Sequence, residues 1–159
     1  MACAHGDLHG ANVLIGQDEK PSLIDFGDVG EACSVIAPTR LEFCIFSHPL
    51  GEACRGGWLP DFSVPWDNTA AYAASSLLGD FIVATRRWAD TTAFGDQDVF
   101  ANAYGRCLKE LKYPDTKKAF FLRAGGKMRR CLERGLSWFI PECFISSTEI
   151  WHFNNVYSV

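Results

Sequence analysis

The sequence predicts an α+β fold that is mostly helical, with a short β-hairpin followed by a helical bundle. Two apolar runs near the start, 13–15 and 22–26, are separated by the polar turn GQDEKP and indicate paired strands. From residue 67 onward, apolar residues recur instead at the 3.6-residue period of a helix. A length of 159 residues with 48% hydrophobic content predicts one domain with an apolar core.

Three segments follow one another in this single domain, 1–159. Segment 1–30 contains a polar loop and the hairpin. Segment 31–66 is rich in Gly and Pro and predicts an irregular connector, with one short helix expected over 39–46. Segment 67–159 predicts the helical region.

A cap and a regular period define the first helix of the helical region. Asp67 or Asn68 is expected to provide the N-cap, since short polar side chains accept hydrogen bonds from the first turn. The apolar positions then continue on one face as far as Thr85. These positions are Ala70, Ala74, Leu77, Leu78, Phe81 and Ile82.

Two more helices are expected after the first. Asp96 begins one that Pro114 ends, and Asp115 caps the next. We expect that last helix to be interrupted at Gly125 and Gly126 and to resume to about Phe139. The apolar face of the helix that begins at Asp96 would consist of Phe100, Tyr104, Leu108 and Leu111.

Composition excludes several classes of protein. With 13% aromatic and 21% charged residues, the chain is not of the disordered type. Seven Cys without a C-x-x-C pair predict free, mostly buried thiols. No signal peptide or membrane span is recognisable, so we expect a cytoplasmic protein without a membrane partner. Residues 1–80 carry 11 acids and 3 bases, and 81–159 carry 8 acids and 12 bases. We interpret the latter as solvated helix surface and expect no nucleic-acid partner.

The stretch HGDLHGANVLI, 5–15, places ionisable side chains close together at the start of the chain. His5, Asp7 and His9 alternate, so on a strand all three would share one face, as a metal centre requires. GDLHG also resembles the first metal-binding motif of the calcineurin-like metallophosphoesterases. The GD-x-x-D and GNH motifs of that family do not occur in this sequence.

A second chemistry also matches these residue types. Phosphoryl transfer needs a carboxylate that orients the attacking hydroxyl and oxygen ligands that hold Mg²⁺ against the triphosphate. Asp7 with Asn12 five residues later, and Asp25 across the hairpin, supply a carboxylate and two oxygen ligands.

HGDLHGANVLI followed by LIDFGD resembles the paired motifs of the aminoglycoside phosphotransferase and choline kinase-like families, H-G-D-x-x-x-x-N and I-D-[FW]-x-D. These families are relatives of the protein kinases. The resemblance covers about residues 5–42 and implies the C-terminal lobe of a protein kinase-like fold, with the helical region on the substrate side.

The resemblance implies a role for each matching residue. Asp7 would be the catalytic carboxylate, and Asn12 and Asp25 would bind Mg²⁺ and, through it, ATP. Asp28, the second acid of the I-D-x-x-D pattern, would assist the metal site. His9 lies among the variable positions, where substrate contact and plain exposure both fit. The supporting residues would be His5, Phe26 and Gly27, with His5 packing on Phe26 and hydrogen-bonding to backbone.

The resemblance also implies an N-terminal lobe that covers the nucleotide and carries a strand Lys. Only four residues precede His5, so we expect this chain to be a C-terminal lobe fragment with little activity alone. A missing N-terminal lobe or a partner chain would complete it. Two alternatives stay open: an inactive kinase-like interaction module and a metallophosphoesterase-like metal site.

The acceptor would be a hydroxyl of a small molecule. An aminoglycoside, another amino sugar, a choline-like alcohol and a protein hydroxyl all fit the resemblance. Carboxylates of the acidic half are candidates to hold a cationic substrate, and solvated loop acids are the competing interpretation. They are Glu31, Glu42, Glu52, Asp61 and Asp67. Trp58 and Trp66 would stack on the substrate or, as we favour, pack in the core.

Overall fold

The structure of this chain is a computed structural model. It describes residues 2–56, 59, 66–95, 97–114 and 117–136, and every structural statement below concerns these residues. The predicted α+β class is confirmed, with helices dominant and two small antiparallel sheets.

Four strands and two 3-10 turns make up the first part of the chain, and helices make up the rest. The strands are β1 (Ala2–Ala4), β2 (Val13–Ile15), β3 (Pro21–Leu23) and β4 (Gly30–Ala32), and the turns are η1 (Gly10–Asn12) and η2 (Phe26–Asp28). The helices are α1 (Ile36–Ser47), α2 (Pro49–Arg55), α3 (Thr69–Ala74), α4 (Gly79–Thr92), α5 (Asp98–Glu110) and α6 (Lys118–Leu136).

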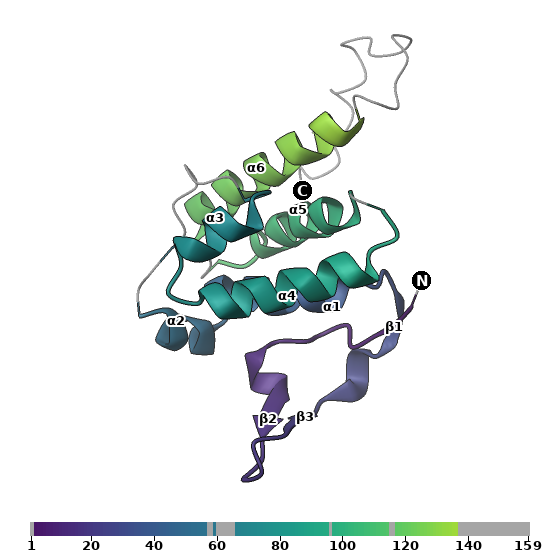
Figure 1. The fold of residues 1–159 in the computed structure, drawn as a ribbon, viewed down its shortest axis with the longest axis vertical. Helices are drawn as coiled ribbons and strands as arrows, with labels where there is room; N and C mark the ends of the chain where they lie inside the picture. The colour runs from purple at the N-terminus through teal and green to yellow at the C-terminus, as the bar shows by residue number, and fades with distance from the viewer. Residues whose placement is uncertain (1, 57–58, 60–65, 96, 115–116, 137–159) are drawn as a thin grey trace.

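The predicted hairpin is present. β2 and β3 pair antiparallel, with Val13 opposite Leu23 and Ile15 opposite Pro21. Pro21 is tolerated because a two-stranded sheet leaves the outer side of each strand without a partner. The hairpin lies at the end of the molecule opposite α6, as Figure 1 shows.

A second pair of strands, which we did not predict from the sequence, flanks the hairpin along the chain. β1 pairs antiparallel with β4, with Ala2 opposite Ala32 and Ala4 opposite Gly30. The segment that follows β1 therefore lies beside the segment that precedes β4.

The expectation of an irregular connector over 31–66 is wrong for most of its described part. α1 and α2 occupy it, and two of the four prolines that suggested irregular structure lie in first turns: Pro38 in α1 and Pro49 at the start of α2. Pro60 and Pro65 lie outside the described residues. Proline is compatible with the first turn of a helix because the N–H groups there have no intrahelical partner.

The first helix predicted for the helical region is divided in two. Asn68 caps α3 as predicted, with its side chain accepting a hydrogen bond of 3.0 Å from Ala71 N. The chain then leaves the helix, and Ser76 Oγ accepts a hydrogen bond from Leu78 N instead, a local alternative to helical bonding. Leu77, expected on the buried face, is 73% exposed as a result.

Two further expectations differ from the structure: the interruption of α6 and the apolar face of α5. α6 continues through Gly125 and Gly126, because a Cβ on Gly125 would come within 3.3 Å of Cys107 Cβ on α5 and glycine permits this close packing. The fully buried residues of α5 are Val99, Ala103, Cys107 and Glu110. Of the predicted apolar face, Phe100, Tyr104 and Leu111 pack partly buried against the core, and only Leu108 is exposed. Asp96 and Asp115 lie outside the described residues, as does the chain beyond 136.

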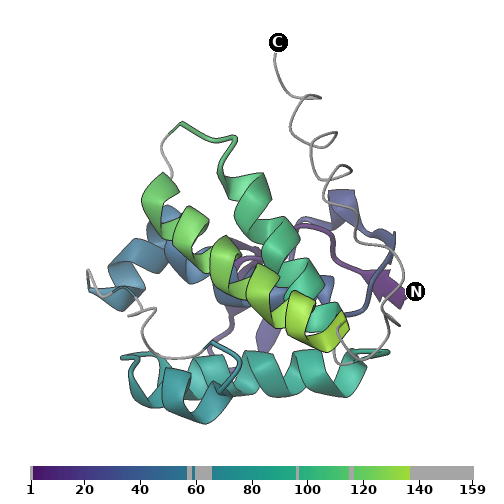
Figure 2. The same cartoon turned by 90° about the horizontal axis from the view of Figure 1, so that it is seen from above.

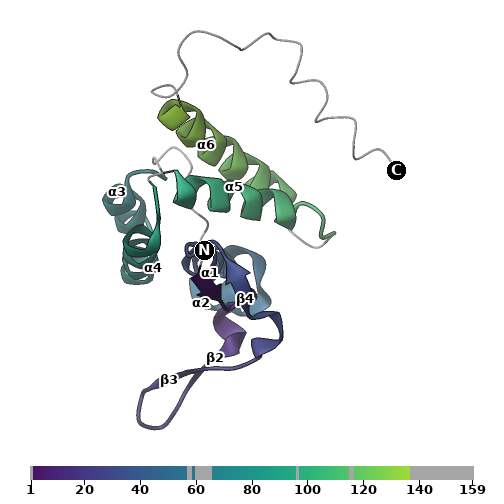
Figure 3. The ribbon, with the colours of Figure 1, turned by 90° about the vertical axis from the view of Figure 1, so that its right-hand side faces the viewer.

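The helices form layers above the hairpin. In Figure 3, α1 and α2 lie next to the hairpin, α5 and α6 form the layer beyond them, and α3 and α4 cover one side. Figure 2 shows α6 crossing over α5 in the view from above. The core between these helices is largely aromatic and includes Phe43, Phe46, Trp66, Tyr72 and Phe121.

The free thiols predicted from the sequence are confirmed for the described cysteines. None of the six described cysteines forms a disulfide. The expectation that most are buried is wrong for half of them: Cys44, Cys107 and Cys131 are buried, Cys33 is half-buried, and Cys3 and Cys54 are exposed. Burial raises the pKa of the Cys107 thiol to about 12, so it stays protonated. Within the described part of the chain, no helix is long and apolar enough to cross a membrane.

A buried ion pair joins α1 to α4. Arg86 Nη2 donates to Glu42 Oε1 at 2.9 Å, and Arg86 Nε donates to Glu42 Oε2, so the pair is bidentate. The guanidinium also donates to the carbonyl oxygen of Trp66 at 3.3 Å, and its Cζ lies 3.2 Å from the centroid of the Trp66 ring. Both side chains are at most 5% exposed, so each charge depends on the other for compensation.

We predict that Arg86→Met lowers the free energy of unfolding by about 3–5 kcal/mol, because it leaves the Glu42 carboxylate buried without a partner. Urea denaturation followed by circular dichroism measures the change. The control is Arg129→Met, which removes an exposed pair with Glu133 and is expected to change the stability far less, because water screens exposed pairs. Equal effects of the two substitutions would contradict a central role for the Glu42–Arg86 pair.

Candidate active site

The polar loop 5–12 begins where β1 ends and finishes in η1, directly before β2. Because β1 pairs with β4, the loop lies against the turn that carries Asp25 and Asp28. The two sequence motifs, 18 positions apart at Asp7 and Asp25, are therefore brought to one place.

Gly6 makes the closest contact between the two motifs. It has a left-handed backbone with φ of +53°, and a Cβ added to it would overlap the backbone carbonyl of Asp28. Only glycine combines this backbone conformation with this close approach. The loop 5–12 therefore packs directly against Asp28, the last residue of the second motif.

His5 has the contacts that the sequence predicted. It is 7% exposed, its Nε2 donates to the carbonyl oxygen of Ile24 at 2.8 Å, and its ring centroid lies 5.3 Å from that of Phe26. Phe26 is otherwise exposed, and Gly27 has no close neighbour except the Asp25 carboxylate. These contacts hold the loop to the segment that follows β3.

Asn12 connects the loop to the same segment. Its Nδ2 donates to the carbonyl oxygen of Asp7 at 3.0 Å, and its own carbonyl accepts from Ile24 N at 3.0 Å. The side chain is buried, and none of the described residues donates a hydrogen bond to its Oδ1. Since an amide presents its oxygen opposite its nitrogen, this oxygen is available to a ligand.

The carboxylates of Asp25 and Asp28 are both exposed, and neither has an ion-pair or hydrogen-bond partner among the described residues. Asp25 has a left-handed backbone, with φ 61° and ψ 63°, which is uncommon outside glycine and which Asp tolerates better than most residues. The two uncommitted carboxylates and the amide oxygen of Asn12 are oxygen donors of the type that Mg²⁺ prefers.

Asp7 is held by a residue that sequence reasoning missed. Arg40 of α1 donates through Nη2 to Asp7 Oδ1 and through Nη1 to the carbonyl oxygen of Gly6. The second oxygen, Asp7 Oδ2, lies 3.7 Å from His9 Nε2. A signal was available in the sequence: Arg40 and Glu42 are the only two charges in the otherwise mostly apolar short helix predicted over 39–46.

A cavity of about 350 Å³ lies beside this carboxylate, lined by His9, Arg40, Cys44, His48 and Arg106 among others. The rings of His9 and His48 stack, with centroids 4.7 Å apart. Burial lowers the pKa of His9, and the nearby Asp7 carboxylate partly offsets that effect. His9 is therefore neutral at pH 7.

The arrangement that suggested a metallophosphoesterase is not found. β1 ends at Ala4, so His5, Asp7 and His9 do not lie on a strand. No group of three or more His, Cys, Asp or Glu residues within the described part of the chain is placed to hold a metal ion.

The acids expected to hold a cationic substrate mostly have other partners. Glu42 is buried with Arg86, Glu52 binds Lys117 at 2.9 Å, and Asp67 binds Arg134 at 2.7 Å. Glu31 is exposed in β4, and Asp61 and Trp58 lie outside the described residues. Trp66 is buried in the core, as we favoured.

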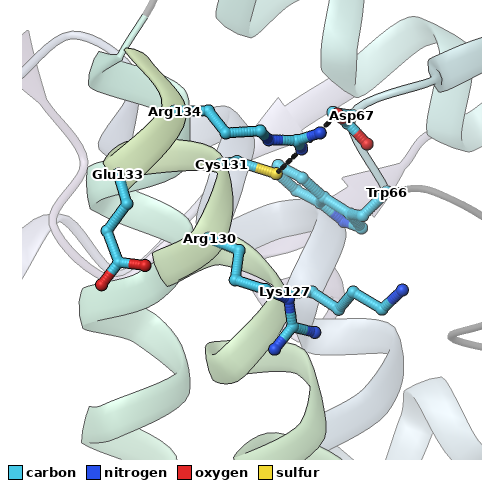
Figure 4. Close-up of a pocket in the computed structure, with 7 residues that line it drawn as sticks. All are labelled: Trp66, Asp67, Lys127, Arg130, Cys131, Glu133 and Arg134. Carbon is cyan, nitrogen blue, oxygen red and sulfur yellow. Dashed lines mark hydrogen bonds and ion pairs between the residues drawn. The ribbon is translucent and has the colours of Figure 1, made fainter. Parts of the chain in front are cut away.

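A larger cavity, of about 510 Å³, lies between α6 and the segment before α3 (Figure 4). Trp66 and Asp67 meet Lys127, Arg130 and Arg134 there. It shares no lining residue with the loop 5–12, so the predicted site residues do not belong to it.

Comparisons with protein-family models, with curated proteins and with solved structures found no match to this chain. The functional assignment therefore depends on the motifs and on the geometry of the loop.

We predict that Gly6→Ala lowers the free energy of unfolding by about 1–3 kcal/mol or more, because the side chain is strained at positive φ and meets the Asp28 carbonyl. Gly10→Ala is the control, since a Cβ there has open space and an ordinary φ. Thermal and urea denaturation measure both. A Gly6→Ala protein as stable as Gly10→Ala would show that the two motifs are not packed together.

We also predict that the pKa of His9 lies below 6.5 and that Asp7→Asn lowers it further, because the Asp7 charge favours the protonated ring. Since the folded pKa is below the unfolded value, the contribution of His9 to stability is present above pH 6.5 and is lost as the pH falls through the folded pKa. An NMR titration of the imidazole signals measures both values. An unchanged pKa in Asp7→Asn would exclude the contact.

Proposed function

We propose that the loop 5–12 and the turn 25–28 form the catalytic and metal-binding part of an ATP-dependent phosphotransferase. The acceptor in this proposal is a hydroxyl of a small molecule, and the described helices are the substrate side of a kinase-like C-terminal lobe. Two contacts support this proposal most directly: the close packing of Gly6 against the Asp28 carbonyl, and the hydrogen bond from the Asn12 side chain to the Asp7 carbonyl oxygen. These contacts bring together the residue types that phosphoryl transfer needs.

Asp7 is the residue that orients the acceptor hydroxyl in this proposal. Arg40 donates hydrogen bonds to one carboxylate oxygen of Asp7 and to the carbonyl oxygen of Gly6, so the rotamer of Asp7 is fixed before the acceptor binds. The other oxygen lies 3.7 Å from Nε2 of His9, which lines the adjacent cavity, and in this proposal the acceptor hydroxyl binds from that cavity. Positioning of this kind provides much of the catalysis in phosphoryl transfer.

Asn12, Asp25 and Asp28 would hold Mg²⁺, through which ATP would be bound. The metal supplies charge neutralisation for the phosphates. The chain contributes two exposed carboxylates and one amide oxygen that are free of competing partners among the described residues. Gly27 lies between the two acids in η2, and the contacts of His5 with Ile24 and Phe26 hold that turn to the loop.

The charges near Asp7 do not favour the cationic acceptor that the family resemblance suggested. Arg40 and Arg106 line the adjacent cavity, and its carboxylate, Glu110, already pairs with Arg106. We therefore propose a neutral or anionic small molecule as the acceptor rather than an amino sugar.

An interaction module is the second candidate, and the hairpin supports it. Four large apolar side chains on and next to the hairpin are between 44% and 64% exposed: Leu14, Ile15, Leu23 and Phe26. Together they form an unusual concentration of apolar surface on a short segment. A partner chain, such as a nucleotide-binding lobe, would bury this surface.

Manganese binding separates the two candidates. We predict that the chain binds Mn²⁺, detected by electron paramagnetic resonance, and that Asp25→Asn weakens this binding about 10-fold or more through loss of one charged ligand. Asp18→Asn, at the exposed tip of the same hairpin, is the control for the change in net charge. Equal binding by the two variants would favour the interaction module.

The reaction itself is tested by following ADP formation with a panel of neutral and anionic hydroxyl compounds. ADP formation that depends on the acceptor and is abolished by Asp7→Asn supports phosphotransfer. ADP formation that Asp7→Asn leaves unchanged would exclude Asp7 as the catalytic carboxylate.

A further inference from the structure

A separate cavity of about 430 Å³ lies between α1 and α5, behind the loop residue Gly6. Part of its wall is made by small residues: Gly6, Ala32, Ala101 and Gly105. Because these residues have little or no side chain, backbone is accessible and the space is kept open. No carboxylate is among the described residues that line it.

Three cationic side chains line the same cavity: Arg40, Arg106 and Lys109. Arg40 is paired with Asp7 and Arg106 with Glu110, both outside the lining. Lys109 is exposed and has no ion-pair partner within the described part of the chain. The two carboxylates leave one positive charge uncompensated.

Three residues of this wall carry a hydrogen-bond donor that has no partner among the described residues. Thr39 is 4% exposed, lines the cavity, and its buried Oγ1 makes no hydrogen bond to any described residue. The buried Nε atoms of Arg40 and Arg106 are also without a hydrogen-bond acceptor among the described residues. Buried polar groups are normally satisfied, so three unpaired donors on residues that line one cavity indicate hydrogen-bonding capacity that the described part of the chain leaves unused. Burial also lowers the pKa of Arg106, a cost that a bound anion would reduce.

We propose that this cavity binds the phosphate group of a small molecule. A phosphate group offers several acceptor oxygens to guanidinium and hydroxyl donors, and its negative charge is opposite in sign to the excess positive charge of the cavity. The volume exceeds what one phosphate ion fills, which favours a phosphomonoester over inorganic phosphate. This site is distinct from the proposed metal site, since its lining contains neither Asn12 nor Asp25.

Arg40 connects the two sites. The guanidinium that lines the phosphate cavity is the one that holds the Asp7 carboxylate and the Gly6 carbonyl. A phosphate bound there would compete with Asp7 for the same donors. The phosphate site therefore couples to the position of Asp7, whatever reaction that residue performs.

The test is isothermal titration of the folded chain with glycerol 3-phosphate and, separately, with inorganic phosphate, both at low ionic strength. We expect saturable binding of one molecule per chain, with the monoester tighter. Tighter binding of inorganic phosphate would overturn the monoester assignment, and no saturable binding of either compound at millimolar concentrations would overturn the site.

Two variants locate the binding. Thr39→Val keeps the shape of the side chain while removing the unpaired hydroxyl, and Lys109→Gln removes an exposed charge, so both are expected to fold. Each should weaken the binding of glycerol 3-phosphate about 10-fold, whereas Lys118→Gln, an exposed lysine on α6, should leave it unchanged. Equal affinities in all three variants would overturn the assignment to this cavity. Asp25→Asn should bind the phosphate normally, so that failure of the metal site and failure of this site are distinguishable.

Discussion

The buried pair of Glu42 and Arg86 is the interaction on which the rest of the structure depends. It fixes α1 against α4, and its guanidinium also covers the ring and binds the carbonyl of Trp66. Two charges removed from water are tolerated only in such a bidentate, fully paired arrangement. Residues two positions apart on a helix are rotated by roughly 200° about the helix axis, so they point to nearly opposite sides. With Glu42 directed into the core, Arg40 is therefore directed toward the loop that contains Asp7.

The candidate site is held together mostly by backbone. Gly6 is seated on the Asp28 carbonyl, His5 donates to the Ile24 carbonyl, and Asn12 donates to the Asp7 carbonyl. Contacts of this kind leave the carboxylates uncommitted at the surface. Asp7 is the exception, because Arg40 binds its side chain directly. This difference agrees with the proposed division of roles, in which Asp7 orients a substrate and Asp25 is a ligand of the metal.

Features that depend on neighbouring residues could be predicted from the sequence, and features that depend on packing could not. The β2–β3 hairpin and the Asn68 cap are local and were predicted correctly. Gly125 was expected to break α6 because isolated glycine disfavours helix, but close contact with Cys107 of α5 compensates for that preference. Pro38 was interpreted as a sign of irregular structure, although its place in the first turn of α1 is compatible with a helix.

The helical class, the hairpin and the spacing of Asp7, Asn12 and Asp25 could be predicted because they follow from residue types at nearby positions. The charges that act on these residues depend on how distant elements pack. Arg40 reaches Asp7 from 33 positions away, and Arg86 takes Glu42 from 44 positions away. A local pattern carries no information about such pairings, since they exist only once α1 has packed against both the loop and α4.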